Sequence, residues 1–106
     1  EITPFENTLC IVTMKRDIVW TTQFKKDYKL ALKRHLEIER LDDIIRCLSR
    51  GETLPEKNKD HALTGTWVGH RECRILPDWL LVYRIEDDVL VLTFARTGTH
   101  SDLFGK

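Results

Sequence analysis

Residues 79–95, Trp79-Leu-Leu-Val-Tyr-Arg-Ile-Glu-Asp-Asp-Val-Leu-Val-Leu-Thr-Phe-Ala95, decide the fold class. Two runs rich in β-branched and aromatic residues, Trp79–Ile85 and Val89–Ala95, flank an acidic turn, and this pattern predicts two strands of an antiparallel hairpin. A third strand-like run, Thr66–Leu76, precedes them across the turn pair Pro77-Asp78. The second half of the chain therefore predicts an antiparallel β-meander.

The first half predicts a short strand and two helices. Ile18-Val-Trp20 is β-branched and aromatic, and the threonines that follow it can cap a helix. Apolar residues recur at helical spacing from Gln23 to about His35 and again from Ile38 to Leu48, before Gly51. The predicted fold is α+β: a short N-terminal strand, two antiparallel helices packed on an antiparallel sheet of about four strands, and a short C-terminal turn.

The length of the chain fits a single domain, and its overall charge does not indicate a particular class of binding partner. The chain has 106 residues, and 17 basic residues balance 17 acidic ones. Residues 15–50 carry ten Lys/Arg against six Asp/Glu, a local basic bias that suits nucleic acid without requiring it. The widely spaced Cys10, Cys47 and Cys73 indicate reduced thiols, and no apolar run is long enough for a membrane span. We expect a cytoplasmic protein that does not interact with membranes.

Residues 1–13 precede the only methionine, Met14. If Met14 is the natural start, residues 1–13 are vector-encoded or upstream sequence, and residues 14–106 form the single domain. Alternatively the run Leu9-Cys-Ile-Val12 forms or extends an edge strand.

Polar residues gather at the predicted strand ends and in the loop that enters the sheet. Two histidines, carboxylates and arginines fit RNA cleavage by attack of the ribose 2′-hydroxyl on its own phosphate, which needs a base, an acid and cationic stabilisation. This chemistry needs no metal, and no cofactor motif is present; Cys73 should point away from His70 and Glu72 on a strand, which argues against a metal site. The candidate residues are His61, Glu72, Arg74, Asp78, Arg96 and His100.

Each candidate also has an ordinary structural interpretation. His61 can be an exposed loop histidine, and Asp78 is a standard turn residue after proline. Trp79 and Phe104 are core aromatics in most proteins. The lysines of the first helix can simply form its solvated face.

Four motifs in order carry a resemblance: Lys59-Asp-His-Ala-Leu-Thr-Gly-Thr-Trp67, Arg71-Glu-Cys73, Pro77-Asp-Trp-Leu-Leu-Val-Tyr83 and Arg96-Thr-Gly-Thr-His-Ser-Asp-Leu-Phe104. From about Met14 to Gly105 the chain resembles the YafQ-type toxins of the RelE/ParE superfamily of bacterial toxin–antitoxin modules. The resemblance implies a RelE-like fold. It also implies a ribosome-dependent endoribonuclease that cuts messenger RNA in the ribosomal A site and is neutralised by a cognate antitoxin.

The resemblance also implies roles for individual residues. His100 would act as general acid or base oriented by Asp78, with His61 as the second proton-transfer or positioning group. Arg96 would hold the phosphate, and Glu72 matches an acidic position near the site. Trp79 and Phe104 would shape the pocket for a codon base.

Arg74 departs from the family pattern, because better-known members have histidine at this position. Arginine stays protonated at physiological pH and cannot act as a base, although its guanidinium can bind the phosphate. Either His61 carries the base role, or activity is reduced, or the residue is a deliberate inactivating change.

Two other functions remain open from the sequence. A ParE-like gyrase inhibitor would share the architecture without needing a histidine-rich site, and a catalytically silent RNA- or antitoxin-binding module would fit Arg74. We expect no DNA binding by the toxin alone. Contacts to ribosomal RNA are predicted for Lys25, Lys29, Lys33, Lys57 and Lys59.

Overall fold

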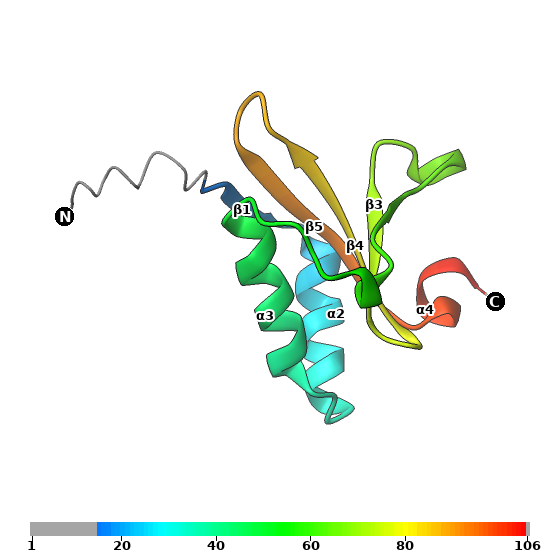
Figure 1. Cartoon of the computed structure of the whole chain (residues 1–106). Helices are drawn as coiled ribbons and strands as arrows, with labels where there is room; N and C mark the ends of the chain where they lie inside the picture. Colours follow the sequence, from blue (N-terminus) through cyan, green and yellow to red (C-terminus); the bar gives the residue numbers. More distant parts are fainter. Residues whose placement is uncertain (1–14, 106) are drawn as a thin grey trace.

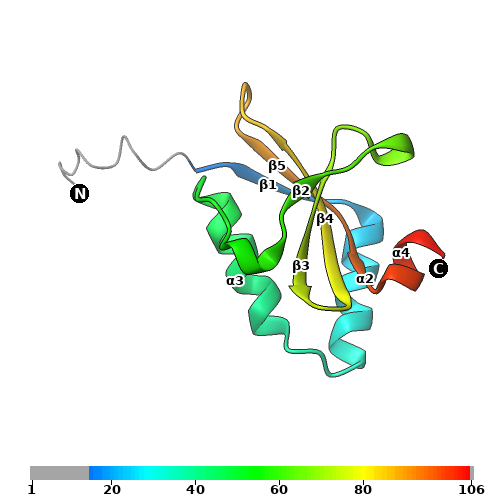
Figure 2. The same cartoon turned by 45° about the vertical axis from the view of Figure 1, so that its right-hand side comes forward.

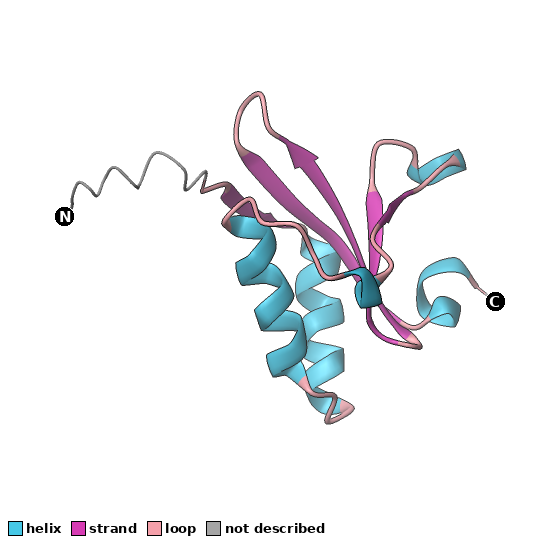
Figure 3. Ribbon diagram, in the orientation of Figure 1, coloured by secondary structure: helices cyan, strands magenta, loops and turns pink. Residues whose placement is uncertain are grey.

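A computed structural model describes residues 15–105 of the chain (Figures 1 and 3). The predicted extension, residues 1–13, and its possible edge strand lie outside the described residues. Two long helices and a sheet make up most of the fold, and three short helical turns complete it. The elements in chain order are β1 (Asp17–Trp20), α2 (Thr22–Lys33), α3 (Ile38–Ser49), the 3-10 turn η2 (Glu56–Asn58), β2 (His61–Ala62), the 3-10 turn η3 (Gly65–Trp67), β3 (Arg71–Leu76), β4 (Trp79–Glu86), β5 (Val91–Gly98) and α4 (His100–Phe104).

The sheet has five strands in the order β1-β5-β4-β3-β2. Strands β2 to β5 are antiparallel, as the predicted meander requires. β1 lies beside β5 and runs parallel to it, from Asp17 opposite Val91 to Trp20 opposite Phe94. The predicted α+β class is confirmed, and the sheet contains one strand more than the four or so expected. The pairing is parallel because the two helices lie between β1 and the meander and act as its long crossover.

Both helices pack on one face of the sheet, which we call the inner face (Figure 2). The side chain of Thr21 accepts a hydrogen bond from the Phe24 amide at 3.0 Å and so caps α2. Phe24 is fully buried and stacks on Phe94, with 5.4 Å between ring centroids. Alternate residues of β4 and apolar residues of α3 complete this core: Leu41, Ile44, Ile45, Leu48, Trp79, Leu81 and Tyr83.

The opposite face of the sheet, the outer face, carries no long helix. Leu80, Val82, Ala95 and Leu103 form a second, smaller cluster there. Segments before β3 and after β5 pack against this cluster through Leu63, Trp67 and Phe104. In Figure 1 the segment with β2 and α4 flank this face on the side away from α2 and α3. Within residues 15–105, no helix has the length and apolar character needed to cross a membrane.

The predicted strand Thr66–Leu76 is wrong at its start, because the strand begins at Arg71. Gly65 and Gly69 have φ values of +68° and +90°, which extended strands do not use. Residues 65–67 instead form η3. Because β3 is shorter than predicted, residues 63–67, which follow β2, fold over the outer face, where Leu63 and Trp67 pack.

Candidate active site

His100 and Asp78 form a hydrogen-bonded pair at one end of the sheet. Asp78 lies in the turn between β3 and β4, and His100 is the first residue of α4. The distance from His100 Nδ1 to Asp78 Oδ1 is 3.0 Å, and the His100 backbone amide lies 3.4 Å from the same oxygen. These bonds hold the pKa of Asp78 below its usual value. Because a carboxylate only accepts, Nδ1 carries the proton, and Nε2 is the ring nitrogen that can exchange a proton with a substrate.

His61 and Glu72 form a second histidine–carboxylate pair. They are direct partners in the register of β2 and β3, so both side chains project to the outer face. His61 Nε2 lies 3.5 Å from Glu72 Oε1, and Nδ1 lies 2.7 Å from the carbonyl oxygen of Lys59. A carbonyl also only accepts, so Nδ1 is the donor here as well. His61 is exposed, whereas only 7% of Glu72 is exposed.

Asp60 fixes the segment that carries His61. Its Oδ1 accepts from Arg71 Nε, and its Oδ2 accepts from Arg71 Nη2, each at 3.2 Å. The Tyr83 hydroxyl also donates to Asp60. Burial raises the pKa of Tyr83, so its hydroxyl stays a donor. Sequence reasoning missed Asp60 as a positioning residue, although its place beside His61 in the Lys59–Trp67 motif was a usable signal.

Arg96 lies against a buried aspartate of α2. Arg96 Nε and Nη2 donate to the two carboxylate oxygens of Asp27 at 3.0 and 3.1 Å. The Thr97 backbone amide also donates to Asp27, at 3.1 Å. Asp27 is 7% exposed, and the ion pair raises the pKa of Arg96, which stays a cation. A phosphate would therefore meet Nη1 of a guanidinium that Asp27 already orients.

Sequence reasoning missed Asp27 too. Position 27 lies three residues after Phe24 and four before Ala31, on the apolar stripe of α2. A carboxylate on that stripe indicates a buried ionic partner, so this position was a usable signal.

Trp79 and Phe104, the two aromatic residues predicted to shape a pocket for a codon base, lie on different faces of the sheet. The side chain of Trp79 is on the inner face and 3% exposed, and Nε1 donates to Thr97 Oγ1 at 3.0 Å. Successive residues of a strand alternate between faces, so Leu80 on the outer face puts Trp79 on the inner face. Phe104 is half-buried on the outer face, where an aromatic ring can meet a base. Phe104 thus shares the outer face with the His61–Glu72 pair, whereas Trp79 lines a cavity between α2 and α4.

Arg74 lies on the outer face, exposed and opposite Leu80 of β4. It shares this face with Glu72, as the alternation along β3 predicts. Lys57 and Lys59 are exposed beside it, in and after η2. The remaining predicted ribosome contacts, Lys25, Lys29 and Lys33, are exposed on α2, in the layer on the other side of the sheet.

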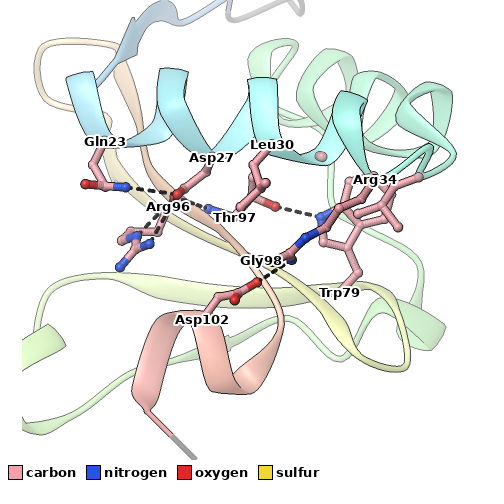
Figure 4. A pocket seen from close by; sticks show the side chains of 11 residues that line it. Gln23, Asp27, Leu30, Arg34, Trp79, Arg96, Thr97, Gly98 and Asp102 are labelled. Atoms are coloured by element: carbon pink, nitrogen blue, oxygen red, sulfur yellow. Dashed lines mark hydrogen bonds and ion pairs between the residues drawn. The ribbon is translucent and has the colours of Figure 1, made fainter.

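A cavity of about 190 Å³ lies between α2, the end of β5 and α4, and Trp79 and Arg96 are among the residues that line it (Figure 4). Arg34 at the end of α2 reaches across it to Asp102 of α4, with 2.8 Å between Nη1 and Oδ2. Asp102 also caps α4, accepting from the Thr99 amide at 3.0 Å while its own amide donates to Thr99 Oγ1. The cavity is thus bordered by ion pairs that hold α4 in place.

Within the described part of the chain, no three His, Cys, Asp or Glu side chains gather as a set able to hold a metal ion. The sheet carries proton-transfer groups and cations in two places. His61, Glu72 and Arg74 lie on the outer face, whereas His100 and Asp78 lie at the end of the sheet and Arg96 lies against Asp27 of α2.

Comparison with known proteins gives a consistent result. The family model described as "Bacterial toxin of type II toxin-antitoxin system, YafQ" matches residues 16–105. The mRNA interferase toxin YafQ of Escherichia coli K12 is 43% identical over 93 residues, 87% of this chain and 99% of that protein. The crystal structure of YafQ from E. coli BL21(DE3) superposes with a TM-score of 0.81 at 42% identity, covering 86% of this chain and 100% of that one.

A second solved structure contains a partner. The E. coli DinJ-YafQ toxin-antitoxin complex includes a chain that is 43% identical to this one, with a TM-score of 0.79 over 86% of this chain and 99% of that one. The family model spans most of the chain, and the resemblance predicted from the four motifs is confirmed. The chain belongs to the YafQ family of bacterial type II toxin–antitoxin toxins.

Proposed function

We propose that the chain is an endoribonuclease that cleaves messenger RNA in the ribosomal A site and acts as the toxin of a toxin–antitoxin pair. The observation that carries this proposal is the presence of two histidine–carboxylate contacts, His100–Asp78 at the end of the sheet and His61–Glu72 on its outer face. Relatives named mRNA interferase toxin YafQ support the reaction class. The DinJ-YafQ complex supports a cognate antitoxin as partner.

The reaction follows from what each group can exchange. Nε2 of one histidine takes the proton of the ribose 2′-hydroxyl, whose oxygen attacks the neighbouring phosphorus. The bond from phosphorus to the 5′-oxygen breaks, and the other histidine donates a proton to that oxygen. Arg96 and Arg74 stabilise the charge that develops on the phosphorane. We assign His100 and His61 to the two proton transfers. Asp78 orients His100 through Nδ1, the Lys59 carbonyl orients His61 through Nδ1, and Glu72 lies beside Nε2 of His61.

Phe104 is the aromatic residue we assign to base contact, because it shares α4 with His100 and lies against the outer face that carries the His61–Glu72 pair. The ribosome supplies the substrate, and a cytoplasmic location follows from that role. The exposed lysines Lys57 and Lys59 lie beside this face and fit contacts to ribosomal RNA. The lysines of α2 would need a second ribosomal contact on the opposite layer.

The gyrase-inhibitor reading is not favoured, since the matched relatives are named as mRNA interferases and two histidine–carboxylate pairs have no use in it. The other alternative, a catalytically silent RNA- or antitoxin-binding module, is supported by Arg74 alone. The following experiment distinguishes it from an active nuclease.

The test is primer-extension mapping of messenger-RNA ends after induction of the parent chain, His100→Ala and Arg74→His. We expect discrete in-frame cuts from the parent, their loss with His100→Ala, and stronger cuts with Arg74→His. His35→Asn is the matched histidine control, because His35 is exposed at the end of α2 with a φ of +59°, which asparagine tolerates. Absence of cuts from both the parent and Arg74→His would contradict the proposal.

A further inference from the structure

Three cations from three separate elements line one hollow beside the candidate active site. Arg40 comes from α3, Lys57 from η2 and Arg74 from β3, and the hollow has a volume of about 220 Å³. The other lining residues are Asn58, Ile75, Leu76 and Pro77. None of the described residues that line it is a carboxylate.

The hollow is fixed by the fold. Asn58 is 7% exposed, and its Nδ2 donates to the backbone oxygen of Arg74 at 2.7 Å. This bond joins η2 to β3, and Figure 2 shows the segment that follows α3 lying between α3 and β3. Lys59, with a φ of +51°, ends η2 in the left-handed region. The backbone positions of Lys57 and Arg74 are therefore set relative to each other before any ligand arrives.

The three cationic side chains favour binding of an anion in the hollow. Arg40 donates Nε to Glu37 at 2.9 Å, and Glu37 lies outside the lining. Like charges gathered around one hollow repel each other, and an anion with several acceptor oxygens converts that repulsion into attraction. Arginine and lysine together suit a phosphate, because guanidinium groups bind its oxygens in pairs and an ammonium binds as a point charge.

The position of the hollow beside the candidate active site indicates that the bound phosphate belongs to an RNA strand. Arg74 belongs both to the hollow and to the outer face, where it lies opposite Leu80. Pro77, which also lines the hollow, directly precedes Asp78, and Asp78 is hydrogen-bonded to His100. An RNA strand whose scissile phosphate lies at His100 therefore passes the hollow with a neighbouring phosphate.

We propose that Arg40, Lys57 and Arg74 form a binding site for a backbone phosphate of the RNA strand next to the one that is cleaved. The proposal rests on the proposed function, because it assumes that the neighbouring phosphate is the one that is cleaved. Binding of RNA at the three cations can nevertheless be tested without catalysis. The proposal adds Arg40, which no motif of the sequence singled out, to the residues that bind RNA.

The test measures binding of a short fluorescent single-stranded RNA with 2′-O-methyl sugars, which cannot be cut, by the purified chain at several salt concentrations. The variants are Arg40→Gln, Lys57→Gln and the double variant. For single strands each phosphate contact contributes about 0.7 to the slope of log affinity against log salt, so the double variant should lose about 1.4 of slope and about 20-fold in affinity near 0.1 M salt.

The control is Arg46→Gln with Arg50→Gln, which removes the same charge from exposed positions in and just after α3 that lie outside the hollow. We expect this control to bind nearly as the parent does. Equal losses in the control and the double variant, or no binding by the parent at low salt, would overturn the site. A double variant that loses affinity for the antitoxin and keeps its affinity for RNA would also overturn it, since the hollow would then hold a protein carboxylate.

Ribosome cleavage assays of the same proteins separate the two proposals. Loss of cleavage in His100→Ala with normal binding and cleavage in the double variant would remove the phosphate site and leave the nuclease. Salt-dependent RNA binding through the hollow by a parent that makes no cuts would keep the site and remove the nuclease.

Discussion

Arg34 and Asp102, 68 residues apart in the chain, are joined by a 2.8 Å ion pair between the end of α2 and the first turn of α4. Asp102 is also the residue that caps α4, and α4 begins with His100. The orientation of the predicted catalytic imidazole thus depends on an arginine that touches neither His100 nor Asp78 through any contact described above.

Arg34→Gln should slow cleavage while substrate binding stays nearly constant. Misplacing a reacting group by about 1 Å can cost up to about 100-fold in rate, and we expect a loss of about tenfold. The measurement is single-turnover cleavage on ribosomes, with the NMR signals of the His100 ring as a second readout. Arg46→Gln, which breaks the exposed pair with Asp43, is the control and should change neither. An unchanged His100 signal in Arg34→Gln would show that the ion pair does not position α4.

Gly98→Ala should displace α4 without unfolding the sheet. An added Cβ would lie 2.9 Å from Asp102 Cβ, a distance that requires one of the two segments to move. Overpacking of this kind costs about 1–3 kcal/mol of unfolding free energy. Thermal unfolding should show the lower stability, and cleavage should fall further than stability explains. Thr93→Ala, on the same strand away from α4, serves as the control; equal cleavage in both variants would contradict the expectation.

Acidification should weaken the contacts that hold α4 against the sheet and α2, because Asp78 and Asp102 become protonated. Hydrogen bonds from His100 lower the pKa of Asp78, and the hydrogen bond from Arg34 lowers the pKa of Asp102. A carboxyl group whose folded pKa is depressed stabilises the fold above its unfolded pKa, about 3.9, and loses that contribution as the pH falls through the folded value. The protection factor of the Leu103 amide, its exchange rate corrected for the intrinsic pH dependence of exchange, should therefore fall below about pH 4. In Arg34→Gln the fall should begin at higher pH, and an identical onset in both proteins would exclude this linkage.

Trp79→Phe should lower stability and leave cleavage per folded molecule unchanged. The substitution removes the hydrogen bond to Thr97, which contributes about 0.5–1.5 kcal/mol, in a side chain that is 3% exposed. Denaturant unfolding gives the first quantity and ribosome cleavage the second. Phe104→Ala is the comparison, and it should reduce cleavage and change the preferred codons. A specific loss of cleavage in Trp79→Phe would restore the base-binding role predicted from the sequence.

The sequence predicted the elements well because their signals are local. Helical spacing gave α2 and α3 to within two residues at each end, and the runs around the turn at residues 86–88 gave β4 and β5. Polar residues at the predicted strand ends, and then the motif resemblance, indicated His61, Asp78 and His100, and their catalytic roles stay predictions. Alternation along β4 indicates that Trp79 lies on the inner face, since Leu80 and Val82 belong to the outer face.

The residues that sequence reasoning missed are those that act across the fold. Asp27, Arg34 and Asp102 acquire their roles through partners about 70 residues away, and no local pattern specifies such pairs. The parallel direction of β1 also depends on distant elements, because it follows from the crossover formed by two helices. Arg40 joins the cationic hollow only because η2 and β3 come to lie beside α3.

The parallel pairing of β1 with β5 affects the order in which the chain folds. The two helices and the meander form mainly from contacts between sequence neighbours, whereas Asp17 has to meet Val91. Closing so long a loop costs conformational entropy that is recovered only when the final contacts form, so β1 docks late. Of the described strands, the one synthesised first therefore joins the sheet last, because a nascent chain that stops before β5 lacks the strand with which β1 pairs.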